Sequence, residues 1–131
     1  MILRGSYIQI GGAKQWISYN AEHLSKPLIL FLHGGPGFVM TPLLQHYCTP
    51  IYEHYLVVHW DQRGSGKSYY FWGNDALSVS QLVADGIELA ELLCKKFQKE
   101  KILYKFEIDD SLEYILTFYY FNILNQISYF L

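Results

Sequence analysis

A glycine-rich stretch directly after a run of large apolar residues is the first part of the chain that could do chemistry. The apolar run is Leu28–Leu32, and the stretch after it is His33-Gly34-Gly35-Pro36-Gly37. Five apolar residues bounded by proline and glycine predict a strand buried on both faces, as in a parallel sheet. At the carboxyl end of such a strand, the backbone N–H groups of Gly34 and Gly35 could point at a developing oxyanion. A plain tight turn fits the same five residues, and Gly35-Pro36 is a candidate cis peptide.

A second motif follows another apolar strand, Tyr55–His59, and reads Trp60-Asp61-Gln62-Arg63-Gly64-Ser65-Gly66-Lys67-Ser68. The two motifs at this separation resemble the α/β-hydrolase superfamily and, within it, the proline iminopeptidase-like serine hydrolases, whose pattern is HGGPG followed by DQRG-S-GKS. The resemblance covers about residues 6–104.

The resemblance implies an α/β fold, namely the N-terminal half of a hydrolase sheet with a lead-in hairpin, parallel strands and a crossover helix. It also implies a serine hydrolase that acts by acyl transfer on peptides with an N-terminal proline, or on related amides or esters. Gly34 and Gly35 would then form the oxyanion-hole loop. The residues expected to support that loop are His33, Pro36, Gly37, Asp61, Arg63 and Gly64.

Two of these supporting residues have an expected role. His33 is expected to orient the loop by hydrogen bonds. Arg63, beside Asp61, is expected to anchor the turn through a bidentate ion pair. We expect this corner to be structural rather than a direct contact to substrate.

The residues that would make and break bonds in such a hydrolase are missing from their expected places. A strand is predicted to start at Lys101–Tyr104, but Lys105–Asp110 follows where the resemblance implies Gly-x-Ser-x-Gly. The last glycine is Gly86, and all five histidines precede the nucleophile position, whereas the superfamily order is Ser, then Asp or Glu, then His. We therefore assign no catalytic residue, not even Ser111, and expect this chain to be inactive by itself.

The C-terminal segment departs from the resemblance. We divide the chain into a partial hydrolase domain, 1–104, and a divergent hydrophobic tail, 105–131, whose last 18 residues carry no charge and many aromatic rings. Three explanations for the missing nucleophile and this tail stay open: a frame change, a truncated gene, or a protein that is truly non-catalytic. The alternative function is that of a non-catalytic α/β fragment that binds a partner or a membrane through this tail.

Composition excludes several classes of function. A net charge of −2 and a pI near 6.2 give no reason to expect a nucleic-acid partner. Two cysteines without metal-ligand spacing predict neither a disulfide framework nor a metal site, and no cofactor is expected. A Walker A loop ending at Ser68 would need glycine at Asp61. The N-terminus lacks a secretory apolar region, which predicts a cytoplasmic setting, and the oligomeric state is open.

Local patterns predict the elements that hold the two motifs. Alternating residues on both sides of Gly11-Gly12 predict a hairpin. A short helix is expected over Pro42–Tyr47, and a loop over Tyr69–Leu77. Apolar residues at helical spacing predict a long helix over Val79–Phe97, capped by Ser78, with a polar face of Asp85, Glu88, Glu91 and Lys95.

Overall fold

The computed structural model describes residues 2–33, 39, 41–47, 49–71 and 77–106. Its centre is a mixed sheet of five strands in the order β1-β2-β4-β3-β5. The hairpin strands are antiparallel to each other and to β4, whereas β3 runs parallel to both β4 and β5. The strands are β1 (Leu3–Ile10), β2 (Ala13–Asn20), β3 (Leu28–Leu32), β4 (Leu56–Asp61) and β5 (Ile102–Phe106).

The hairpin forms as expected, although both of its strands are longer than the alternating pattern suggested. Gly11 and Gly12 connect the strands with φ of 57° and 76°. Two successive left-handed residues are the requirement of a type I′ turn, whose twist matches that of the flanking strands. The glycines therefore fix the register, which pairs Ile10 with Ala13.

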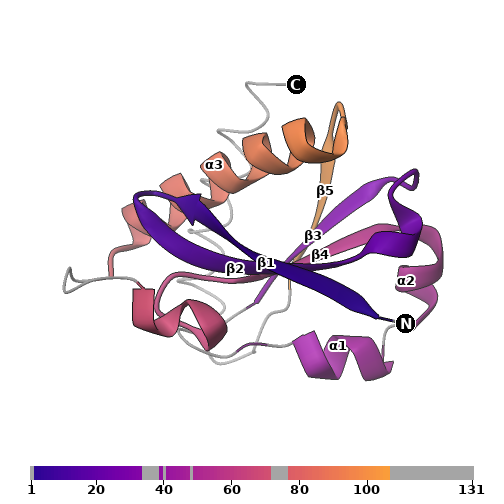
Figure 1. Cartoon of the computed structure of the whole chain (residues 1–131), viewed down its shortest axis with the longest axis horizontal. Helices are drawn as coiled ribbons and strands as arrows, with labels where there is room; N and C mark the ends of the chain where they lie inside the picture. Colours follow the sequence, from indigo (N-terminus) through magenta and orange to yellow (C-terminus); the bar gives the residue numbers. More distant parts are fainter. Residues whose placement is uncertain (1, 34–38, 40, 48, 72–76, 107–131) are drawn as a thin grey trace.

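Helices lie on both sides of the sheet (Figure 1). The long helix α3 covers one side, and the short α1 and α2 lie on the other. The expected short helix is present as α1, whereas α2 was not expected. The helices are η1 (Ala21–His23), α1 (Thr41–Tyr47), α2 (Thr49–His54), η2 (Gly66–Phe71) and α3 (Val79–Phe97), where η denotes a 3₁₀ helix.

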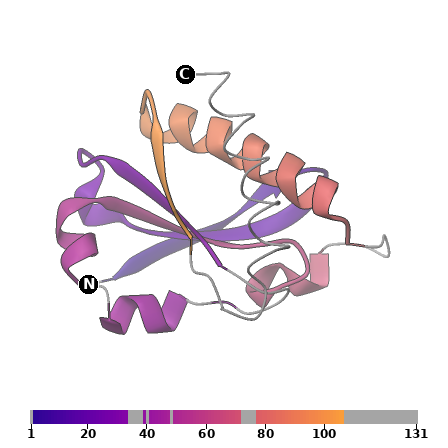
Figure 2. The ribbon, with the colours of Figure 1, turned by 180° about the vertical axis from the view of Figure 1, so that it is seen from behind.

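The buried residues of β3 divide between two cores, because successive side chains of a strand point to opposite faces. Leu28, Leu30 and Leu32 join the core under α3, while Ile29 and Phe31 join the core under α1 and α2. All five are buried, which confirms the expectation of a strand covered on both faces. Figure 2 shows β5 beside the C-terminal end of α3, at the sheet edge opposite β1.

Helix α3 has the predicted bounds, and the Ser78 side chain accepts a hydrogen bond from the Gln81 N–H at 3.2 Å. Its buried residues include Gly86, Leu89 and Leu93, as the apolar spacing predicted. The predicted polar face is wrong at Asp85, which is fully buried. The cause is a cationic partner from another part of the chain, Arg63.

A histidine is buried in the second core. His59 of β4 stacks on Phe31 with a centroid distance of 5.5 Å, and the Tyr52 hydroxyl of α2 contacts its Nε2 atom. Desolvation by burial lowers the pKa of His59 to about 4. The ring is therefore neutral at physiological pH.

Candidate functional site

The carboxyl ends of β3 and β4 are neighbours, because the two strands are parallel and pair Leu32 with Trp60. The first residues after these ends are held together by a reciprocal pair of hydrogen bonds. The Gln62 backbone N–H donates to His33 Nε2 at 3.1 Å, and the Gln62 side-chain amide donates to the His33 carbonyl at 2.9 Å. Both residues are buried. The chain therefore enters the glycine-rich stretch from a fixed point.

This pair of bonds also fixes the tautomer of His33. A backbone N–H can only donate, so Nε2 must be the acceptor and the ring proton must lie on Nδ1. The Ser65 hydroxyl is 3.2 Å from the same Nε2 atom, and it donates to the Gln62 carbonyl at 2.6 Å. Ser65 thus closes the turn after β4 against the His33 ring.

Asp61, the last residue of β4, is 6% exposed. Its Oδ2 atom accepts the Lys67 N–H at 2.9 Å. Burial raises the pKa of this carboxyl above its usual range, and the Lys67 backbone bond and charge partly oppose that effect. Gly66 permits the close approach: a Cβ atom there would lie near this carboxylate, and φ of 51° also favours glycine.

Ser68 connects the neighbouring strands β2 and β4 at the carboxyl end of β4. Its fully buried hydroxyl accepts the Trp16 N–H of β2 at 2.8 Å and donates to the Asp61 carbonyl of β4. The Lys67 ammonium lies 4.1 Å from the centroid of the Trp16 ring. The Gly66-Lys67-Ser68 sequence therefore closes a structural junction between β2 and β4. Sequence reasoning missed this role.

Arg63 corrects one expectation: it pairs with Asp85 of α3 rather than with Asp61. Its Nε and Nη2 atoms lie 2.8 and 3.1 Å from the two carboxylate oxygens of Asp85. Nη2 also donates to the Gly11 carbonyl at 2.8 Å. The bidentate geometry was expected, but the partner is 22 residues away in sequence. Arg63 thus ties the turn after β4 to both the hairpin tip and α3.

Two glutamines complete the environment of Asp85. The side-chain amides of Gln15 and Gln81 donate to its carboxylate at 2.9 and 2.7 Å. Gln15, which is fully buried, accepts the indole N–H of Trp60 at 2.9 Å. The buried charge therefore has a cation and two further donors, as a stable buried carboxylate requires.

The remaining expected site residues have mixed outcomes. Gly64 lies in the turn between Arg63 and Ser65 with φ of 80°. Gly34, Gly35, Pro36 and Gly37 lie outside the described residues, and with them the oxyanion loop and the cis peptide. No group of three or more metal-binding side chains occurs in the described part of the chain. What the described geometry provides is a rigid frame at the carboxyl ends of β3 and β4, where the first described range of the chain ends at His33.

Comparison with known proteins gives this frame a context. No family model matches the chain. A protein of Bacillus subtilis (strain 168) named probable aminopeptidase YbaC is 36% identical over 96 residues, which are 72% of this chain and 30% of that protein. A proline iminopeptidase-related protein from Thermus thermophilus superposes with a TM-score of 0.59 and 27% identity, over 79% of this chain and 36% of that one. The chain carries the N-terminal part of an α/β-hydrolase fold.

More distant structures agree on the fold. The epoxide hydrolase VrEH1 from Vigna radiata superposes with a TM-score of 0.62 at 19% identity, over 80% of this chain and 32% of that one. Such low identity supports the fold alone. Because the chain spans about a third of the length of each of these proteins, the activities of the whole proteins are proposals for this chain. The superfamily expected from the two motifs is confirmed.

None of the helices in the described ranges is both long and apolar enough to cross a membrane. The tail on which a membrane-associated role would depend lies outside those ranges.

Proposed function

We propose that this chain supplies the oxyanion side of an aminopeptidase-like serine hydrolase, with peptides bearing an N-terminal proline, or related amides or esters, as substrates. The supporting observation is the reciprocal hydrogen-bonded pair of His33 and Gln62, which holds the entry to Gly34-Gly35 at the carboxyl edge of two parallel strands. In open α/β sheets, ligands bind outside this edge. The identity to a probable aminopeptidase supports the substrate class.

The reaction would be acyl transfer. A serine attacks the substrate carbonyl, a histidine accepts its proton, and the backbone N–H groups of Gly34 and Gly35 stabilise the negative oxygen. His33 and Arg63 would act as positioning residues: one holds the start of the loop, and the other holds the neighbouring turn. Neither touches the reacting atoms in this scheme.

The 131-residue chain itself is proposed to have no turnover. It has no glycine after Gly86 and no histidine after His59, so it offers neither a nucleophile elbow nor a base in the order that the fold requires. An oxyanion hole without its triad retains about 10³–10⁴-fold rate enhancement over water, and only while substrate still binds.

Two assays test this absence of turnover. The purified chain is incubated with proline p-nitroanilide and p-nitrophenyl acetate, and separately with a fluorophosphonate probe. We expect rates equal to the blank and no covalent label. Stoichiometric labelling of a serine would refute the proposal, and Ser111 is the first site to inspect by mass spectrometry.

A chimera tests the positive half of the proposal. Residues 1–104 of this chain are joined to the remainder of the Bacillus subtilis relative, and that relative serves as the parent control. We expect the chimera to hydrolyse proline p-nitroanilide, because its loop and turn would face a complete set of bond-making residues. A folded chimera that is inactive, beside an active parent, would show that this chain does not supply a working oxyanion loop.

A further inference from the structure

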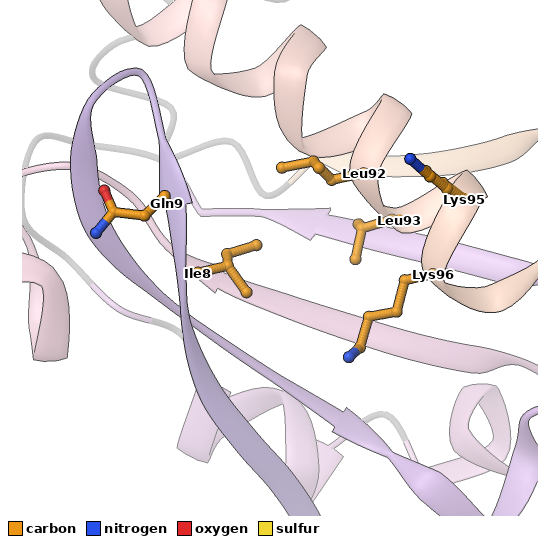
Figure 3. A pocket seen from close by; sticks show the side chains of 6 residues that line it. All are labelled: Ile8, Gln9, Leu92, Leu93, Lys95 and Lys96. Atoms are coloured by element: carbon orange, nitrogen blue, oxygen red, sulfur yellow. The ribbon is translucent and has the colours of Figure 1, made fainter.

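A groove separates β1 from the C-terminal half of α3 (Figure 3). Its volume of about 570 Å³ falls within the range of small-molecule sites, roughly 300–1,000 Å³. The hydrolase proposal assigns no role to it. The side chains that line it are Ile8, Gln9, Leu92, Leu93, Lys95 and Lys96.

The floor of the groove is apolar. Ile8 points from β1 toward α3 and packs against the core, Leu93 is fully buried beneath it, and Leu92 is 37% exposed at its side. An exposed leucine on its own is ordinary. Here it borders a concave apolar surface formed by two elements.

Two contacts connect the hairpin to α3 near the groove. Toward the hairpin tip, the Gly11 N–H donates to the Glu88 carboxylate at 2.7 Å. Toward the other end of α3, Tyr19 packs edge-on against Phe97 with a centroid distance of 5.0 Å. The two walls are therefore fixed relative to each other, and the groove does not depend on a loop.

The rim of the groove is cationic. Lys95 and Lys96 are exposed, and the Lys96 ammonium lies 5.8 Å from the centroid of the Phe97 ring. None of the lining residues is acidic. Lysine stems cover apolar surface while their ammonium groups reach water. An occupant therefore meets apolar walls first and positive charge at the edge.

We propose that this groove binds a single-chain anionic amphiphile of the long-chain carboxylate class. The alkyl chain would lie over Ile8, Leu92 and Leu93. The ammonium groups of Lys95 and Lys96, which extend from α3 in different directions (Figure 3), would offer the carboxylate positive charge at two points of the rim. A peptide fits less well, because Gln9 is the one uncharged polar side chain of the lining and offers few partners to the N–H and C=O groups that would face the apolar floor. An alkyl chain carries no such groups.

The test uses the full chain and sodium dodecanoate below its micellar concentration, followed by two-dimensional NMR of isotope-labelled protein. We expect saturable shifts confined to β1 and the second half of α3. Leu92→Asp and the double variant Lys95→Glu/Lys96→Glu should each weaken binding at least tenfold. Leu92 and both lysines are exposed, so the variants should fold, which far-ultraviolet circular dichroism checks.

The matched control is Lys99→Glu/Lys101→Glu, which makes the same change in net charge outside the groove and should leave binding within twofold. Dodecanol, which shares the chain but lacks the charge, should bind at least tenfold more weakly than dodecanoate. Equal affinity for the two ligands would overturn the anionic class. Equal weakening by the control and groove variants would overturn the location. Tighter binding of an acidic amphipathic peptide at the same shifts would overturn the choice of occupant.

Discussion

Removing the guanidinium of Arg63 should destabilise the fold far more than a surface charge change does. In Arg63→Met the apolar stem remains, but Asp85 loses the donors at 2.8 and 3.1 Å and keeps only those of Gln15 and Gln81. Breaking a buried ion pair from one side leaves an uncompensated charge, which costs about 3–5 kcal/mol. That is a large share of a total stability of about 5–15 kcal/mol.

Urea unfolding followed by circular dichroism at pH 7 measures this cost. The control is Arg4→Met, the same chemical change at an exposed position of β1. Surface substitutions of this kind usually change stability by less than about 0.5 kcal/mol. A value for Arg63→Met within that range would refute the assignment of a stabilising buried pair.

A double-mutant cycle separates the pair from its surroundings. In Arg63→Met/Asp85→Leu both charges are gone, so the loss should be smaller than the sum of the single losses by about 0.5–3 kcal/mol. The parent stability should not return fully, because Gln15 and Gln81 lose their acceptor. Simple additivity would show that the two side chains do not depend on each other.

Two further outcomes are expected. The folded-state pKa of His59, about 4, lies below the unfolded value of 6.5. The unfolded state therefore binds more protons, and stability falls as pH drops below 6.5. Between pH 7 and 5 the free energy of unfolding should decrease by about 2 kcal/mol. His59→Phe should abolish this decrease, whereas the exposed-site control His54→Phe should retain it. Gly86→Leu should cost about 1–3 kcal/mol in urea unfolding because it overpacks the buried side of α3, whereas the exposed Glu91→Leu should cost little. An unchanged midpoint for Gly86→Leu would contradict that packing.

Much of the frame was predictable because its signals are local. The five apolar residues Leu28–Leu32 determine a strand buried on both faces, and the spacing within Val79–Phe97 determines a helix with one buried side. Gly11-Gly12 determines the turn type through its backbone freedom. Each of these features depends on residues within a few positions of one another.

The errors arise where a distant residue changes the environment. Asp85 lies three residues after Leu82 and four before Leu89, so its spacing placed it on the buried side, but its charge argued for solvent. Arg63, from a separate turn, makes burial tolerable together with the amides of Gln15 and Gln81. Helix α2 was missed although Thr49-Pro50 repeats the Thr41-Pro42 start of α1. The bridging hydroxyl of Ser68 could not be predicted, because it depends on how β2 pairs with β4.

The ties between the hairpin and α3 have a consequence for synthesis on the ribosome. Gly11 contacts a residue 77 positions later in sequence, and Gln15 contacts one 70 positions later. At about 5–20 residues per second, the finished hairpin waits roughly 4–15 s for its partner helix to be made. Ile10 and Ile17, both fully buried in the folded chain, stay uncovered on the α3 side during that interval. The nascent chain is then most open to chaperones and to premature association.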